Sequence, residues 1–475
     1  MTLRFRNTLG GALETFEPLD PANVRMYSCG PTVYAPAHVG NFRSFLFADL
    51  TRRYLAWKGY PVTWVMNITD VDDKIIRDAA AAGVTIGELT AVHTEAFLAE
   101  LGRLRVTMPD VLPRATDHIP DMARLIATLM ERGHAYRTDD GSIFFRIASW
   151  PAYGTLARLD PTQQRVGERV EADEYSKDDV RDFAIWKGAR PGEPSWSTEV
   201  GEGRPGWHIE CSAMSMRYLG ASFDIHTGGI DLVFPHHEDE IAQSEAATGQ
   251  RFVRTWLHCD HLQMGGEKMA KRTGKLRRPA EIYEQGWSPR ALRYAVLAAH
   301  YRSSLEFSDE SLAAASSAVE RLSTALAALD MYTSDRPDDP EVAMALTRSR
   351  AAFEAAMDDD LAISSALGVL FDLVRDLNRR TAEHSMSTAD ARRSAAMMRD
   401  LDGVLGVMEA DEMAGGEVLS AEIETLMEQR IAARTAKDWA RSDALRDTLF
   451  QLGIVVEDTR DGQRWKRMEQ IDGQT

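Results

Sequence analysis

The sequence is poor in cysteine and contains no long apolar run. Only three cysteines occur among 475 residues, at positions 29, 211 and 259, which argues against a disulfide framework and favours a reducing compartment. No stretch approaches the roughly 20 apolar residues that cross a bilayer, and the start MTLRFRNTLGG has no signal-peptide pattern. These absences predict a cytoplasmic protein with no membrane partner.

Positive charge is also in deficit, with 55 Lys and Arg against 73 Asp and Glu and a formal net charge of −18. Indiscriminate binding to polyanions is therefore disfavoured, and a nucleic-acid partner would have to be bound by local basic patches. Apolar residues make up 44% of the chain, which is ordinary for a soluble globular protein. At about 150 residues per domain, the length predicts roughly three or four structural units.

The first third of the sequence alternates strand-like and helix-like segments. VRMYSCG (24–30) is typical of a buried strand, NFRSFLFADLTRRYLAWKG (41–59) has apolar residues at helical spacing, and PVTWVMNIT (61–69) predicts the next strand. A strand–helix–strand unit of this length predicts a right-handed crossover, and therefore an α/β fold with a doubly wound parallel sheet. Because such sheets bind ligands at the carboxyl ends of their strands, functional residues should directly follow the strands.

The pattern of the rest of the chain predicts an insertion, a helical region and a small carboxyl-terminal unit with both helix and strand. The predicted units are a parallel-sheet domain formed by residues 1–110 and 205–258, an insertion over 111–204, a loop region over 259–308, a helical domain over 309–415 and a small α/β unit over 420–475. In the last unit, the pattern predicts one helix over 426–453, a strand over 454–459 and a hairpin turn at Asp461-Gly462.

Two stretches have the composition of phosphate-binding segments. In HVGN, His38, Gly40 and Asn41 precede or open a predicted helix, where unpaired N–H groups attract phosphate. In GEKMAKRTGK (266–275), three lysines and an arginine lie close to glycines, and flexible ammonium groups can neutralise phosphoryl oxygens. A polar-capped loop and a solvated surface turn remain the plain alternatives for these two stretches.

A third group of residues could bind a metal ion. His236 and Glu240 are four positions apart, so on a helix they share a face. Together with Cys29 and Cys211 they would form a four-ligand set suited to Zn²⁺. No short-range metal signature links the two cysteines, so a buried structural cysteine and a solvated helix start remain the alternative.

Taken together, these stretches resemble a known family. HVGN followed far downstream by KMAKR is similar to the paired signatures of class I aminoacyl-tRNA synthetases. More narrowly, the chain resembles cysteinyl-tRNA synthetases over nearly its whole length, in the stretches MYSCGPTVYAPAHVGN, NITDVDDKII, GRPGWHIECSAM, FDIHTGGIDLVFPHHEDEIAQSEA and HYRSSLEFS. The resemblance implies a Rossmann-like catalytic domain with an inserted connective domain, followed by a helical tRNA-binding bundle and a small α/β anticodon-binding unit.

The resemblance also implies the metal site and its ligands. One Zn²⁺ per subunit would be held by Cys29, Cys211, His236 and Glu240 and would receive the thiolate of substrate cysteine. Three further residues that could bind metal fall outside the ligand motifs. His237 and Glu238 are expected to be non-ligands, and Cys259 is expected to be structural.

By the same resemblance, further residues surround the substrates. Thr69, Trp207 and His226 would line the amino-acid pocket, although a core role is the alternative for Trp207. ATP, bound with Mg²⁺, would be contacted by Gly228, Gly229 and Asp231 on its adenosine side and by His38, Gly40, Asn41, Lys268 and Lys271 on its phosphate side. Asn41 stands where many class I enzymes have histidine, and Ala270 and Arg272 replace the usual serines, but both lysines are kept.

The implied macromolecular partner is tRNA(Cys), bound by a monomer. Residues 430–467 contain nine Lys and Arg against six Asp and Glu, a basic surface in an acidic chain. Arg434, Trp439 and Asp443 would stack on or hydrogen bond to anticodon bases. The alternative is that Trp439 belongs to a core and that Asp443 is an ordinary surface charge.

The sequence therefore predicts an ATP-dependent ligase that activates L-cysteine and transfers it to the 3′ end of tRNA(Cys). One alternative is a ligase joining cysteine to an amino sugar, of the mycothiol type, which needs no anticodon-binding unit. Another is a zinc-containing tRNA-binding protein without catalysis. The basic carboxyl-terminal unit disfavours the first alternative, and His38, Lys268 and Lys271 disfavour the second.

Overall fold

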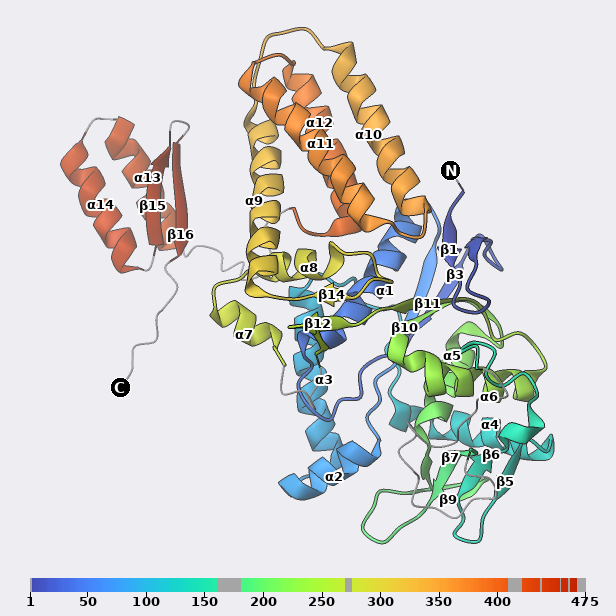
Figure 1. Ribbon diagram of the computed structural model, residues 1–475. Helices are drawn as coiled ribbons and strands as arrows, with labels where there is room; N and C mark the ends of the chain where they lie inside the picture. Colours follow the sequence, from blue (N-terminus) through green and yellow to red (C-terminus); the bar gives the residue numbers. More distant parts are fainter. Residues whose placement is uncertain are drawn as a thin grey trace. The chain divides into compact units, whose positions relative to one another are not determined.

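The computed structural model describes residues 2–159, 181–269, 276–408, 421–435, 438–452, 454–459 and 462–467. The chain divides into two compact units, residues 1–409 and residues 410–475. In Figure 1 the first unit runs from blue to orange and the second is red.

The centre of the first unit is a parallel sheet of four strands, β3 (Val24–Ser28), β4 (Val62–Met66), β10 (Phe223–Gly229) and β11 (Val253–Cys259). Their order in the sheet is β11-β10-β3-β4, and every neighbouring pair is parallel. Strand β4, which follows β3 in the chain, lies on one side of β3, and the later strands β10 and β11 lie on its other side. The strand order therefore reverses between β3 and β10, which is where open α/β sheets form their ligand crevice.

Helices cover both faces of this sheet. Helix α1 (Val39–Trp57) packs with Met26 and Trp64 in one apolar cluster. The adjacent residues Tyr27 and Val65 point to the opposite cluster, which contains residues of α5 (Trp207–Leu219) and α6 (Glu238–Thr248). Successive side chains of a strand point to opposite faces, so this division shows a sheet buried on both sides. The predicted doubly wound α/β fold is confirmed.

The insertion forms a second sheet that is antiparallel throughout, with the order β5-β6-β7-β9-β8. Its strands are β5 (Ala135–Arg137), β6 (Ile143–Phe145), β7 (Phe183–Gly188), β8 (Trp196–Thr198) and β9 (Gly201–Pro205). Helix α4 (Ile119–Glu131) packs its apolar face in the same cluster as residues of this sheet.

An ion-pair cluster joins the insertion to the helix that follows β4. Lys187 and Arg204 lie opposite each other on β7 and β9 and are both buried, so their charges would repel without a shared anion. The carboxylate of Asp73, the first residue of α2 (Asp73–Ala82), accepts hydrogen bonds from Lys187 Nζ at 2.6 Å and from Arg204 Nη2 at 2.5 Å.

A small three-stranded sheet and several helices complete the first unit (Figure 1). The sheet contains β12 (Leu262–Met264), β13 (Glu267–Lys268) and β14 (Leu305–Glu306). The remaining helices are α3 (Ile86–Arg103), α7 (Pro279–Glu284), α8 (Pro289–Leu297), α9 (Asp309–Met331), α10 (Pro340–Asp358), α11 (Ile363–Ala382) and α12 (Thr388–Leu405), and a hairpin of β1 (Arg4–Arg6) and β2 (Leu13–Thr15) lies near the amino terminus. Ser288 caps α8 by accepting from Ala291 N, as the Ser-Pro start of that segment predicts.

The carboxyl-terminal unit corrects one prediction. The single helix expected over 426–453 is instead two helices, α13 (Ala421–Thr435) and α14 (Trp439–Gln451). The second helix begins at Asp438, whose side chain accepts from Arg441 N as a helix cap. The expected hairpin is confirmed as β15 (Ile454–Thr459) paired with β16 (Gly462–Arg467).

A buried ion pair fixes α1 against the rest of the first unit. Arg293 of α8 donates to Asp49 of α1 at 2.6 Å, and neither side chain is exposed to solvent. Arg293 also donates to the carbonyl oxygens of Leu405 and Leu104. Burial alone would raise the pKa of Asp49, but Arg293 and Arg53 beside it hold that pKa below its ordinary value.

We expect Asp49→Asn to lower the free energy of unfolding by about 3–5 kcal/mol, because it leaves the Arg293 charge buried without its counter-ion. Urea unfolding followed by circular dichroism measures this effect. The exposed pair Arg399–Asp330 provides the matched control, since Asp330→Asn should cost less than about 1 kcal/mol. Equal effects of the two substitutions would contradict this role of the buried pair.

Candidate active site and metal centre

The candidate site lies at the carboxyl ends of the central strands. Cys29 directly follows β3, Thr69 lies three residues after β4, and Gly228 and Gly229 are the last residues of β10. These ends meet at the edge where the strand order reverses. The fold therefore brings together residues that are up to 200 positions apart in the sequence.

The two signature stretches meet at the amino terminus of α1. His38 is the residue before the helix, and its backbone N–H donates to Asn41 Oδ1 at 3.0 Å. A Cβ atom on Gly40 would stand 3.0 Å from the His38 ring and 3.6 Å from the Cβ of Met269. A side chain at position 40 would crowd the His38 ring and would touch Met269, which belongs to the lysine-rich stretch.

Both described ends of the lysine-rich loop are anchored. Before residues 270–275, which lie outside the described residues, Lys268 Nζ lies 2.9 Å from Asp231 Oδ2. After them, the carbonyl oxygen of Arg277 accepts from Val39 N at 2.9 Å, next to His38. Lys271, like Ala270 and Arg272, lies outside the described residues.

The predicted zinc ligands converge in the layer between the sheet and helices α5 and α6. Cys29 Sγ lies 3.6 Å from Cys211 Sγ and 3.6 Å from Glu240 Oε1, and His236 Nε2 lies 3.0 Å from Glu240 Oε1. A tetrahedral zinc ion with bonds of about 2.0–2.3 Å separates its ligand atoms by about 3.3–3.8 Å. The donor set therefore fits Zn²⁺ in its chemistry, and both distances from the Cys29 sulfur fall in this range, whereas His236 and Glu240 lie at hydrogen-bond distance and would have to separate slightly around an ion.

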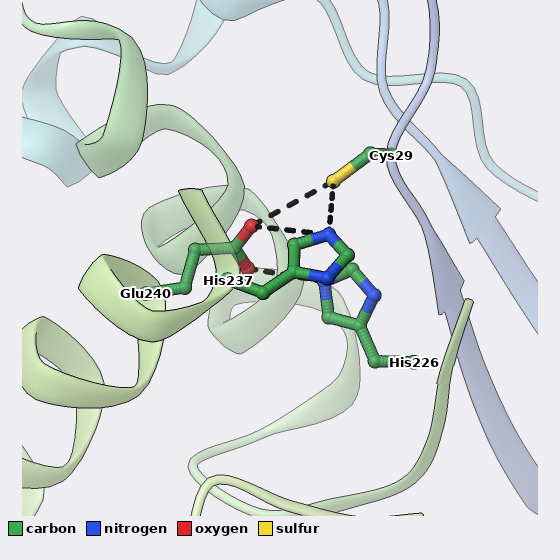
Figure 2. A group of neighbouring side chains, drawn as sticks. All are labelled: Cys29, His226, His237 and Glu240. Carbon is green, nitrogen blue, oxygen red and sulfur yellow. Dashed lines mark hydrogen bonds and ion pairs between the residues drawn. The ribbon is translucent and has the colours of Figure 1, made fainter. Parts of the chain in front are cut away.

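A second possible ligand set shares two of these residues. Figure 2 shows Cys29, His226, His237 and Glu240 pointing toward one another. His237 Nε2 lies 3.3 Å from Cys29 Sγ, and His226 Nε2 lies 3.0 Å from Glu240 Oε2. His237, expected from the sequence to be a non-ligand, is therefore as close to the cluster as His236. The two sets therefore overlap at Cys29 and Glu240.

A partly buried histidine, His208, and a buried one, His258, extend the cluster, and no sequence pattern predicts either. His208 Nδ1 lies 2.9 Å from His236 Nδ1, while its Nε2 lies 3.4 Å from the carboxylate of Asp239. His258 Nε2 lies 2.7 Å from His237 Nδ1, and Thr8 Oγ1 lies 2.7 Å from His258 Nδ1. Such outer partners hold a ligating imidazole in one tautomer and one orientation.

The polar cluster shifts the pKa values of its own members. The hydrogen bond from Cys29 lowers the pKa of Cys211 to about 6, although burial opposes this change. Burial would lower the pKa of His236, but Cys211 and Glu240 beside it raise that pKa to about 10. Burial would likewise raise the pKa of Glu240, but His226 and His236 lower it to about 2. Cys211 is therefore a thiolate near neutral pH, the form that binds metal.

The predicted amino-acid pocket surrounds this cluster. Trp207 stacks on the His236 ring with a centroid distance of 4.3 Å, and 39% of its surface is exposed, so the alternative of a core role is wrong. Thr69 is buried, and its hydroxyl donates to Glu210 Oε2 at 2.8 Å. His226 is fully buried behind Glu240. Glu210 was not predicted, because a glutamate beside Cys211 follows no recognisable spacing.

The glycines on the adenosine side are required by close packing. A Cβ atom on Gly228 would lie 2.6 Å from His237 Cε1, and one on Gly229 would lie 2.6 Å from Asp231 Oδ1. The buried His237 ring leaves no room for a side chain at position 228, whereas the half-exposed Asp231 carboxylate could move aside for one at position 229.

In the carboxyl-terminal unit, two of the three predicted anticodon residues are neighbours. The Arg434 guanidinium lies 5.7 Å from the centroid of the Trp439 ring. Trp439 is 56% exposed, so its assignment to a core is wrong. Asp443 is on the surface of α14, with its carboxylate 3.5 Å from Arg446.

Within the described part of the chain, no helix combines the length and apolarity that would be needed to span a membrane. Family models match three segments of the chain. Residues 15–317 match the class I (C) tRNA synthetase catalytic domain, residues 352–409 match the DALR domain, and residues 417–465 match the cysteinyl-tRNA ligase anticodon binding domain.

Relatives and solved structures agree with these matches. The chain is 46% identical to the cysteine–tRNA ligase of Methylococcus capsulatus and 42% identical to that of Koribacter versatilis, covering 98% of this chain and 100% of each relative. Methionyl-tRNA synthetase from Mycobacterium tuberculosis, bound by methionyl-adenylate, shares the fold at a TM-score of 0.59 and 14% identity, over 81% of this chain and 92% of that one. A LeuRS–tRNA–LeuAMS complex from Agrobacterium radiobacter K84 does so at 0.60 and 12% identity, over 82% and 85%. The chain belongs to the cysteine–tRNA ligase family of class I aminoacyl-tRNA synthetases.

Proposed function

We propose that this protein activates L-cysteine with ATP to form cysteinyl-adenylate and pyrophosphate, and then transfers cysteine to the 3′ end of tRNA(Cys). The observation that carries the proposal is the convergence of a thiol, imidazole and carboxylate cluster with both signature stretches at the reversal point of the sheet. The anticodon-domain match over residues 417–465 favours tRNA over an amino sugar as acceptor. Acting as a cytoplasmic monomer is part of the same proposal.

Adenylate formation requires placement and positive charge more than a base. The carboxylate of cysteine is already ionised when it attacks the α-phosphorus of Mg²⁺-bound ATP, and pyrophosphate leaves. His38 and Asn41 hold the phosphates at the amino terminus of α1, while Lys268 and Lys271 neutralise the charge that develops on the phosphoryl oxygens. Gly228, Gly229 and Asp231 hold the adenosine side. In the second step, a terminal hydroxyl of tRNA attacks the acyl carbon of the adenylate, the acyl–phosphate bond breaks and AMP leaves.

Selection of cysteine rests on the metal cluster. One bound Zn²⁺ supplies a soft Lewis acid that prefers a thiolate to the hydroxyl of serine. Cys29, Cys211, His236 and Glu240 would hold this ion, one per chain. Trp207 covers the His236 ring, while Thr69 and His226 complete the amino-acid pocket.

The two ligand sets make different predictions for metal content. Cys211 belongs only to the proposed set and His237 only to the alternative, so Cys211→Ser should lower bound zinc from about one ion to near zero. His237→Gln should keep it. Elemental analysis of the purified full-length variants, with circular dichroism as a check of folding, measures this. The reverse result would assign the metal to the alternative set.

The signature lysines should affect the first step. We expect Lys268→Ala or Lys271→Ala to lower kcat for cysteine-dependent ATP–pyrophosphate exchange about 10²–10³-fold, because each removes a cation from the developing phosphoryl charge. Lys268→Arg is the charge-preserving control and should lose less. Zinc content should stay at the wild-type level in all three variants. Wild-type exchange in both alanine variants would rule out this role.

The anticodon prediction can be tested on an exposed aromatic pair. Trp439→Ala should raise KM for tRNA(Cys) about 5–100-fold in aminoacylation, since stacking on one base is worth about 1–3 kcal/mol. Phe450→Ala on the same helix, 52% exposed, is the matched control and should leave KM within about twofold. Exchange without tRNA should be unchanged in both. If the wild-type protein charged an amino sugar and not tRNA, the ligase alternative would replace the proposed acceptor.

A further inference from the structure

The turn at the base of the signature loop has an unusual backbone. Strands β12 and β13 are joined by Gly265 (φ +59°) and Gly266 (φ +75°), both in the left-handed region. Two such residues form the tight connection whose twist matches a β-hairpin. Because Lys268 pairs with Gln263 across this hairpin, the position of its backbone depends directly on the turn.

A carboxylate from another strand holds this turn. Glu306 Oε1 accepts from Gly265 N at 2.5 Å, and Glu306 Oε2 accepts from Gly266 N at 3.2 Å. Successive backbone N–H groups in a turn form a concave site for an anion, and here each oxygen of the carboxylate takes one N–H group. Glu306 thus fixes both residues of the turn.

Glu306 is itself on a rigid support. It lies opposite Gln263 in the parallel pairing of β14 with β12. The next residue, Phe307, is buried and donates its N–H to Gln263 O at 2.8 Å, and Ser308 then caps α9. The turn is therefore attached through one side chain to the first helix of the bundle.

The side chain of Lys268 is oriented at a second point. Its Nζ lies 2.9 Å from Asp231, which follows the end of β10 on the adenosine side of the candidate site. The Lys268 backbone is thus fixed through the Glu306 turn, and its ammonium group is directed toward the ends of the central strands.

We propose that Glu306 is a positioning residue for adenylate formation, acting by fixing the Gly265–Gly266 turn and thereby the Lys268 ammonium group. This inference rests on the proposed function. It predicts different effects on the two steps of the reaction. Activation needs the Lys268 ammonium group at the phosphates of ATP, whereas transfer from a formed adenylate does not.

The test is Glu306→Gln in the full-length protein. The amide keeps the shape and one acceptor but presents an NH₂ group to the second backbone N–H, so one hydrogen bond is lost. We expect kcat for cysteine-dependent ATP–pyrophosphate exchange to fall about tenfold with KM for cysteine unchanged. Single-turnover transfer from preformed cysteinyl-adenylate to tRNA should stay within about twofold. Glu284→Gln, an exposed glutamate of α7, is the matched charge control and should change neither step.

A double-mutant cycle that combines Glu306→Gln with Lys268→Ala tests whether Glu306 acts through Lys268. If Glu306 acts through Lys268, then Glu306→Gln should cause almost no further loss of exchange in the Lys268→Ala background. Independent, multiplying losses would overturn the proposal, as would unchanged exchange in Glu306→Gln or equal losses in activation and transfer. Wild-type protein without cysteine-dependent exchange would instead overturn the proposed function itself, so the two failures can be told apart.

Discussion

A buried carboxylate surrounded by thiols and imidazoles is the constraint on which the site depends. Glu240 is fully buried, yet His226 and His236 hold its pKa at about 2, against the effect of burial. A charge in this position must be paired or bound to a metal. The cluster therefore places buried polar groups between the sheet and α6, at the point where the strand order reverses.

Helix α1 connects this crevice to the rest of the first unit. Its amino terminus carries His38 and Asn41 beside the lysine-rich loop, while Asp49 in its middle is paired with Arg293 of α8. Near its end, Tyr54 donates to Asp358 of α10 at 2.7 Å. One helix therefore links the end at which phosphate binding is proposed to the helical bundle, and Glu306 adds a second link through β14 and α9.

Much of the fold was predictable because it follows local periodicity. Strand β3, helix α1 and strand β4 appear where alternation and helical spacing place them, whereas the break before Asp438 was missed because the apolar spacing continues across it. The i, i+4 spacing of His236 and Glu240 predicted their shared face. His208 and His258 could not be found from spacing, because their roles arise only when distant strands and helices bring the rings together. Glu306 was missed for the same reason.

The outer hydrogen bonds explain why one of two overlapping ligand sets suits zinc better. His236 Nδ1 contacts His208, whose other ring nitrogen faces Asp239, and a carboxyl group is one of the usual partners that orient a ligating imidazole. His237 Nδ1 contacts His258 Nε2, and His258 Nδ1 in turn contacts the hydroxyl of Thr8. The set with His236 also contributes two thiolates, which Zn²⁺ prefers to a second imidazole. In the proposed arrangement, His226 and His237 stay outside the ligand set and contact Glu240 and Cys29.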